Sequence, residues 1–199
     1  MSKRHEARDN QPTGVIRTFI CIEIPESIKS RINKLQESLR QIDAQVSWAK
    51  ASNIHLTLKF LGGVEASRIE RVSKALERAA NGISPFEVEV SGSGCFPSPR
   101  SPRVLWVGFS KVPEFLQQLY SNIEDELARD SFEREKRKFS PHLTIGRIRT
   151  PNNAARVAEA LIASGFESET FIASEVILMR SDLRPTGSIY TPQAVVRLS

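Results

Sequence analysis

The sequence predicts an α+β fold of two similar lobes, each an antiparallel sheet covered by helices, with an active-site cleft between them. Stretches typical of strands alternate with stretches typical of helices. One order of strand, helix and strand occurs twice, at an offset of about 88 residues. With 199 residues, of which 40% are hydrophobic, the chain can bury a sizeable core in one domain of two joined lobes.

The first repeat begins with a strand over residues 17–24, which are rich in β-branched and aromatic side chains. Pro25 and Glu26 then open a helix, because proline suits an early helical position and an acid suits the positive end of the helix dipole. The apolar positions of this helix recur at intervals of four, three and four residues: Ile28, Ile32, Leu35 and Leu39. A strand containing His55 completes the repeat.

The second repeat follows the same order. Residues 104–109 form its first strand, and Pro113 and Glu114 open its helix. The apolar positions again match, at Leu116, Tyr120, Ile123 and Leu127. The closing strand contains His142, so the sequence predicts a duplicated unit and lobes related by a pseudo-two-fold axis.

Each repeat continues with a second helix and further strands. The helices are expected over residues 66–80 and 152–163, and the strands over 86–90, 175–179 and 189–198. The segment 92–102 is dense in Gly, Pro and Ser and is expected to cross between the halves. Residues 1–14 are polar and are expected to form a flexible tail, which leaves 15–199 as the folded domain.

The two closing strands share a short motif, His-Leu-Thr-Leu at 55–58 and His-Leu-Thr-Ile at 142–145. Because successive side chains of a strand point to opposite faces, each His shares a face with the Thr two residues later. A lone strand histidine is usually structural, but the repetition favours a functional role here. If the strands face each other, the cleft holds His55, His142, Thr57 and Thr144.

Two imidazoles suit in-line attack on phosphorus. Histidine titrates near neutral pH, so one can be a neutral base that activates water while the other is a cationic acid that protonates the leaving oxygen. Threonine hydroxyls can donate to the phosphate oxygens. This chemistry needs no metal or other cofactor. Two distant histidines are an incomplete zinc set, so a His–His–water metal site is the lesser alternative. The chain has no nucleophile elbow and no Gly-rich nucleotide loop.

Other residues near the motifs have a functional and an ordinary interpretation. Arg147 falls on the opposite face of an ideal strand from His142; a bulge at Gly146 would bring it round to bind phosphate, and otherwise it is a solvated arginine. Lys59 is in phase with His55 and either adds positive potential or is simply exposed. The run 134–139 leads into the second motif and includes Lys136 and Lys138, which can steer a polyanion or only be solvated. Two aromatic residues can stack on a base or belong to the core: Phe139 and Tyr190.

The net charge of +5 mildly favours a polyanionic partner such as nucleic acid. The two cysteines do not form a disulfide framework, which favours a reducing cytosol. No apolar stretch approaches the roughly 20 residues that span a bilayer, and residues 1–14 are not a secretory signal. We therefore expect a cytoplasmic monomer without a membrane segment.

These residues resemble the two-histidine (2H) phosphoesterase superfamily, and within it the RNA 2',3'-cyclic phosphodiesterases, also called LigT-like proteins or 2'-5' RNA ligases. The resemblance runs from about residue 16 to the C-terminus and includes both His-x-Thr motifs, Trp48, and the segments 17–20, 96–97, 103–106 and 181–190. It implies hydrolysis of an RNA terminal 2',3'-cyclic phosphate to a 2'-phosphate without metal. It also implies that His55 is the general acid, that His142 is the general base, and that Thr57, Thr144 and Arg147 hold the phosphate.

Two alternatives remain open. The same site can act on 2'-5'-linked oligonucleotides or other nucleotide cyclic phosphates, or run the ligation direction. The positive charge alone is also consistent with a non-catalytic RNA-binding module, although such a module leaves the paired histidines unexplained.

Overall fold

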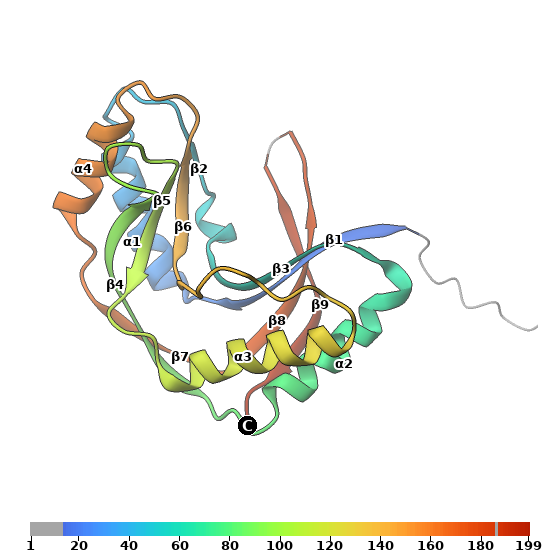
Figure 1. Cartoon of the computed structure of the whole chain (residues 1–199). Coiled ribbons are helices and arrows are strands. Elements are labelled where there is room, and N and C mark those ends of the chain that lie inside the picture. The colour runs from blue at the N-terminus through green and yellow to red at the C-terminus, as the bar shows by residue number, and fades with distance from the viewer. Residues whose placement is uncertain (1–13, 186) are drawn as a thin grey trace, which may run out of the picture.

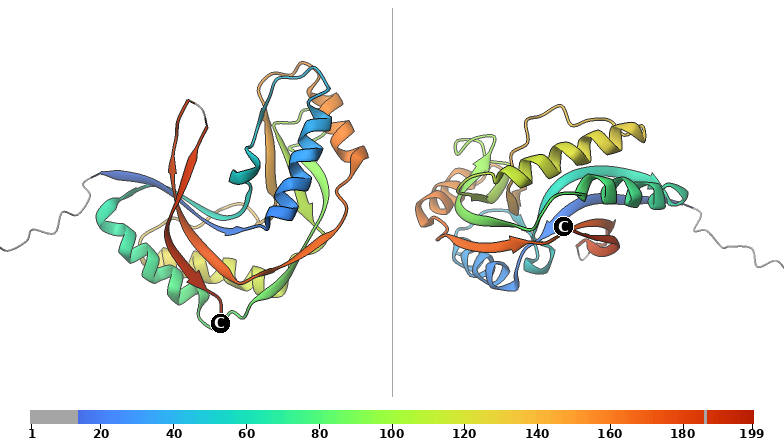
Figure 2. Two further views of the ribbon diagram at one scale, coloured as in Figure 1. Left: turned by 180° about the vertical axis from the view of Figure 1, so that it is seen from behind. Right: turned by 90° about the horizontal axis from the view of Figure 1, so that it is seen from below.

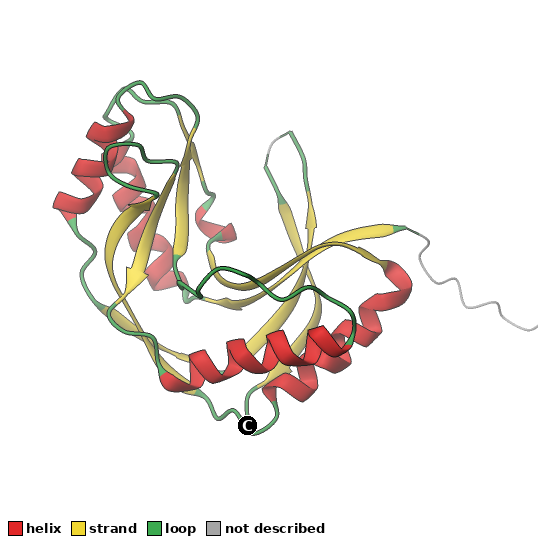
Figure 3. Cartoon of the chain, viewed as in Figure 1, coloured by secondary structure: helices red, strands yellow, loops and turns green. Residues whose placement is uncertain are grey.

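The computed structural model describes residues 14–185 and 187–199, so all but the last residue of the expected tail lies outside it. Nine strands form two antiparallel sheets in this part of the chain, with helices on the outer faces (Figures 1 and 3). The predicted α+β fold of two lobes is confirmed.

The first sheet has the strand order β3-β1-β8-β9, and the second has the order β2-β6-β5-β4-β7. The strands of the first sheet are β1 (Val15–Glu23), β3 (His55–Glu65), β8 (Glu175–Asp182) and β9 (Ile189–Arg197). Those of the second are β2 (Val46–Trp48), β4 (Phe86–Phe96), β5 (Val104–Phe109), β6 (Leu143–Ile148) and β7 (Glu169–Ala173). When β3 is aligned with β6, the order β3-β1-β8-β9 corresponds to β6-β5-β4-β7, and β2 is an additional edge strand. The sheets therefore carry the expected pseudo-symmetry.

In the described part of the chain, four helices cover these sheets, and the helices after β1 and β5 each lie on the sheet of the other lobe (Figure 2). They are α1 (Glu26–Leu39), α2 (Ile69–Ala80), α3 (Glu114–Arg129) and α4 (Ala154–Ser164), with short 3-10 turns at Ala51–Asn53 and Ala66–Arg68. The α2 helix packs against β8, β9 and α3, so α2 and α3 lie with the first sheet. The α4 helix packs against β4, and Gln36 of α1 donates to the carbonyl oxygen of Ile145 in β6 at 2.7 Å. The helix after the first strand of each repeat thus covers the sheet of the other lobe.

This exchange means that the lobes are not the two halves of the sequence. The expectation that residues 92–102 cross between halves is wrong, because β4 continues to Phe96 and pairs with β5 in the same sheet, with Ser93 opposite Val107 and Phe96 opposite Val104. The Gly- and Ser-rich stretch is strand backbone, and only the following turn is irregular. Pairing with β5 outweighs the weak strand propensity of glycine and serine.

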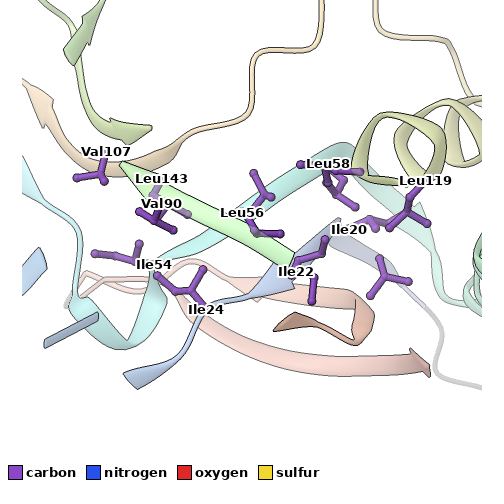
Figure 4. Packing of buried hydrophobic residues seen from close by; sticks show 14 of the residues in the cluster. Ile20, Ile22, Ile24, Ile54, Leu56, Leu58, Val90, Val107, Leu119 and Leu143 are labelled. Atoms are coloured by element: carbon purple, nitrogen blue, oxygen red, sulfur yellow. The ribbon is translucent and has the colours of Figure 1, made fainter. Parts of the chain in front are cut away.

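One hydrophobic cluster continues through both lobes (Figure 4). Ile20 and Leu56 of the first sheet belong to it together with Val107 and Leu143 of the second. Most of the apolar positions expected on the two repeat helices are buried: Ile28, Ile32, Leu39, Leu116, Ile123 and Leu127. A shared core fixes the lobes against each other, and this fixes the two motif strands as well.

Candidate active site

The motif strands β3 and β6 show the expected alternation and contact each other between the lobes. Leu56 and Leu58 are buried, as are Leu143 and Ile145. The side chains of His55, Thr57, His142 and Thr144 are partly exposed. The apolar face therefore anchors each strand in the core, and the polar face is left for the cleft.

Two cavities, of about 600 and 900 Å³, meet along the motif strands. His55 lines the smaller cavity and His142 lines the larger one. Four side chains line both cavities: Thr57, Phe60, Thr144 and Arg147. The structure thus places one imidazole in each cavity, next to a shared wall that carries two hydroxyls, a guanidinium group and the ring of Phe60.

Arg147 reaches this wall because β6 contains a bulge. Leu105 of β5 lies opposite Gly146 and Trp106 lies opposite Thr144, so Ile145 has no partner on β5. One extra residue reverses the alternation of side chains beyond it. The bulge therefore turns Arg147 to the face of His142 and Thr144, although an unbroken strand would place it on the opposite face.

The first motif strand contains the equivalent bulge. Ile20 of β1 lies opposite Lys59 and Cys21 lies opposite Thr57, so Leu58 is the extra residue. This shift brings Phe60 to the cleft, where 65% of its surface is exposed. Phe60 thus occupies the position in the first lobe that Arg147 occupies in the second.

The bulge also corrects the expectation for Lys59. Its side chain is only 6% exposed, and its ammonium group lies 2.7 Å from a carboxylate oxygen of Glu124 on α3. It also donates to the carbonyl oxygen of Glu133 at 2.9 Å. In an unbroken strand Lys59 would share the face of His55, as predicted, whereas the bulge at Leu58 turns its side chain toward α3. Its charge is thus paired with that of Glu124, while the residue still forms part of the lining of the larger cavity.

Each histidine lies against aromatic rings and is held by the backbone two residues earlier. The ring of Phe19 stacks on His55 at 4.6 Å, and Tyr190 meets His55 edge-on at 5.3 Å. Phe96 meets His142 edge-on at 5.1 Å. Nδ1 of His142 lies 2.7 Å from the Ser140 carbonyl oxygen, which fixes a proton on Nδ1 and leaves Nε2 free to accept one.

Burial favours the neutral form of both imidazoles. It lowers the pKa of His55 to about 4, although a hydrogen bond to the Asn53 carbonyl opposes the shift and the charge of Lys29 adds to it. Burial also lowers the pKa of His142, against the hydrogen bond to Ser140 and with a contribution from Arg147. Without substrate, neither pKa shift identifies one histidine as the acid, because both move in the same direction.

The other predicted contacts lie around the larger cavity, except Tyr190. Lys136 and Lys138 are exposed and line the cavity on the His142 side. Phe139 also lines it, but its ring stacks on Tyr120 of α3 at 4.0 Å, which holds the loop against the helix. Tyr190 lines the cavity on the His55 side.

Several cleft residues were missed by the motif analysis. Phe60 could have been found, since it lies 87 residues before Arg147, the offset that separates the two histidines. Lys50, Arg149 and Arg184 also line the smaller cavity, but they belong to segments far apart in the sequence and carry no local pattern.

Within the described residues, no three His, Cys, Asp or Glu side chains form a metal-binding group. The helices of this part of the chain include none with the length and apolar character of a membrane span.

The "LigT like Phosphoesterase" family model matches the chain twice in succession, over residues 22–106 and 108–190. This division agrees with the duplication. The RNA 2',3'-cyclic phosphodiesterase of Methanothermobacter thermautotrophicus is 35% identical over 184 residues, which cover 92% of this chain and 99% of that protein. The protein of the same name from Thermotoga maritima is 34% identical over 88% of this chain and 91% of its own length.

Solved structures share the fold. A crystal structure from Thermus thermophilus superposes with a TM-score of 0.76 at 22% identity, covering 92% of this chain and 98% of that one. The structure of E. coli LigT complexed with 3'-AMP gives a TM-score of 0.75 at 25% identity, covering 93% of this chain and 99% of LigT. With the family model matched across both repeats and both motifs in one cleft, the chain belongs to the LigT-like phosphoesterase family.

Proposed function

We propose that this chain hydrolyses the terminal 2',3'-cyclic phosphate of RNA to a 2'-phosphate by two-histidine acid–base catalysis. The observation that carries the proposal is that His55 and His142 lie in adjoining cavities whose shared wall includes Thr57, Thr144 and Arg147. In-line displacement needs a base and an acid on opposite sides of phosphorus. The names of the relatives support the substrate, and the LigT complex with 3'-AMP supports a nucleotide ligand.

In the proposed reaction, His142 accepts a proton from water at Nε2 as the water oxygen attacks phosphorus. The bond from phosphorus to the 3'-oxygen breaks, and His55 donates its proton to that oxygen. The product carries a phosphate on the 2'-oxygen and a free 3'-hydroxyl. Two imidazoles supply both proton transfers, so the proposed chemistry needs no metal.

The phosphate is held by the shared wall. The hydroxyls of Thr57 and Thr144 donate to the non-bridging oxygens, and the guanidinium group of Arg147 offsets the charge that develops on them. An anionic phosphate next to His55 also raises the pKa of that imidazole from its low value without substrate. The acid role proposed for His55 requires that this imidazole holds a proton once substrate is bound, and the charge of Arg147 favours the neutral form of His142 that a base requires.

We also propose that the enzyme acts as a monomer in the cytoplasm. Both motif strands come from one chain, so one copy completes the site. Cys21 and Cys95 are free and buried, which is consistent with a reducing compartment. Lys136 and Lys138 add positive potential at the mouth of the cleft on the His142 side and attract RNA.

The test is incubation of a short RNA ending in 2',3'-cyclic phosphate in the presence of EDTA, with the product identified by NMR. We expect a 2'-phosphate product, and a loss of at least about 100-fold in kcat for His55→Ala and for His142→Ala. His5→Ala, which changes the remaining histidine of the chain, is the matched control and should retain activity. Loss of turnover in EDTA, or full activity of both motif variants, would show that the proposed mechanism is wrong.

A further inference from the structure

The cavity on the His55 side is lined by positive charge. Its described lining includes five cationic side chains and no carboxylate: Arg17, Lys50, Arg147, Arg149 and Arg184. No ion pair within the described part of the chain involves any of these five. Like charges in one cavity repel each other, and a bound anion would relieve that repulsion. We call Arg17, Lys50, Arg149 and Arg184 the cationic pocket, since Arg147 belongs to the shared wall.

Two of the segments that form the cationic pocket are tied together. The side-chain amide of Asn53 donates to the Ser188 carbonyl oxygen at 2.8 Å, which fastens the β8–β9 loop to the segment before β3. Gly187 lies against Lys50, and a Cβ at this glycine would be 3.3 Å from Cε of the lysine. Arg184 and Lys50 are therefore held in one cavity by contacts between distant segments.

The second sheet supplies another fixed cation. Arg149 follows β6 and donates from Nη2 to the Ser47 hydroxyl at 2.7 Å. Its backbone N–H also donates to the Gln45 carbonyl oxygen at 2.8 Å. The position of this guanidinium group is thus set by the edge strand β2, whereas Arg17 enters from β1 in the other sheet.

The cavity on the His142 side has a different character. Phe96, Tyr120 and Phe139 contribute aromatic surface, and Glu133 and Glu135 stand among its cations. Arg134 is already paired with Asp125 at 2.6 Å. A chain of phosphodiesters is therefore better matched to the cationic pocket than to this side.

The proposed in-line reaction also places the RNA chain on the His55 side of the cleft. The leaving 3'-oxygen lies beside the acid, His55. This oxygen belongs to the terminal ribose, and the 5'-oxygen of the same ribose is joined to the rest of the RNA chain. We propose that the cationic pocket binds the phosphate on the 5'-oxygen of the nucleotide that bears the cyclic phosphate. The substrate class is then RNA ends and 5'-phosphorylated nucleotides, in preference to nucleosides with a free 5'-hydroxyl. This inference rests on the proposed function and extends it.

Three substrates with the same terminal base test the proposal: a nucleoside 2',3'-cyclic phosphate with a 5'-hydroxyl, the same compound with a 5'-phosphate, and a dinucleotide ending in the cyclic phosphate. We expect kcat/KM to be at least about tenfold higher for the two substrates with a phosphate at the 5'-oxygen, the effect of one good charge-assisted contact. A rise for the dinucleotide alone would place the binding energy in the second nucleoside and overturn the proposal.

The variants Lys50→Met and Arg149→Met should lower this preference ratio toward one. Arg156→Met is the matched control, because Arg156 is exposed on α4 and lines neither cavity, and it should keep the ratio. Thermal unfolding checks that each variant is folded. As a second measurement, kcat/KM for the dinucleotide should fall more steeply with salt than that for the 5'-hydroxyl compound, and the two slopes should converge in the pocket variants.

Two further results would overturn the proposal. One is equal kcat/KM for all three substrates in the unchanged protein. The other is a ratio that survives in both pocket variants and is lost instead in Lys136→Met, which would place the chain on the His142 side. Failure of the proposed function is distinct, because none of the three cyclic phosphates would then be opened.

Discussion

The buried ion pair of Lys59 and Glu124 is expected to stabilise the fold only as an intact pair. The two side chains are 6% and 7% exposed, and their charged atoms lie 2.7 Å apart. The other carboxylate oxygen of Glu124 accepts the backbone N–H of Glu135 at 2.9 Å. Lys59→Met leaves this carboxylate buried without its cation. Breaking such a pair costs about 3–5 kcal/mol of unfolding free energy. At about 2–4 °C per kcal/mol for a chain of this size, Tm should fall by roughly 6–20 °C.

A double-mutant cycle separates the pair from its parts. Replacing both residues, as in Lys59→Met with Glu124→Leu, removes the charge imbalance, so we expect this variant to recover to within about 2 kcal/mol of the unchanged protein. Lys74→Met is the matched control, because Lys74 and Glu70 also lie 2.7 Å apart but are 62% and 77% exposed. The control should leave the urea midpoint unchanged, since solvent screens an exposed pair.

Urea unfolding, followed by circular dichroism and tryptophan fluorescence, measures four variants: the single variants Lys59→Met and Glu124→Leu, the double variant, and the control Lys74→Met. The reasoning is refuted if Lys59→Met costs less than about 1 kcal/mol, or if the double variant is as unstable as the sum of the single ones. Limited trypsin digestion gives a local readout. The pair fastens residues 133–135, so cleavage within the basic run 134–138 should become faster in Lys59→Met but not in Lys74→Met.

Three further outcomes are expected at the site. Arg147→Met should lower kcat/KM about 30- to 100-fold through loss of a charge-assisted contact, and Arg147→Lys should restore only part of it, as steady-state kinetics will show. Phe60→Ala should raise KM for RNA substrates about fivefold or more with little change in kcat, because an exposed ring that stacks on a base contributes about 1–3 kcal/mol; an effect on kcat alone would contradict a stacking role. The low pKa of His55 means that between pH 6.5 and about 4 the unfolded chain binds a proton that the folded chain does not. The contribution of neutral His55 to the free energy of unfolding should therefore be present in full above pH 6.5 and fall by about 3 kcal/mol toward pH 4. His55→Asn should flatten this pH dependence in urea titrations.

Local sequence patterns predict much of the fold, because its helices and strands are short and regular. The helix starts at Pro25 and Pro113 and the strand over residues 104–109 follow from propensity and periodicity, which act within a few residues. The alternation that buries Leu56 and Leu143 and leaves His55 and Thr144 for the cleft is likewise a local property of an extended chain.

The exchange of helices between lobes did not follow from these patterns. An amphipathic helix such as α1 must bury its apolar face, but its sequence does not specify which sheet receives it. The choice is made by contacts across the whole chain, such as the hydrogen bond from Gln36 to the carbonyl oxygen of Ile145. For the same reason, local composition predicts a crossing between halves at the Gly- and Ser-rich part of β4, whereas pairing with β5 makes it a strand.

By itself, the sequence determined that two His-x-Thr strands exist, which of their faces are polar, and that a duplication relates them. Only the tertiary structure decided which neighbours join the histidines. A one-residue bulge in each strand reverses the alternation, so that Phe60 and Arg147 enter the cleft while Lys59 is drawn to Glu124. A bulge is fixed by pairing with another strand, and the cationic pocket by the meeting of distant segments. Neither interaction leaves a periodic signal in the residues concerned.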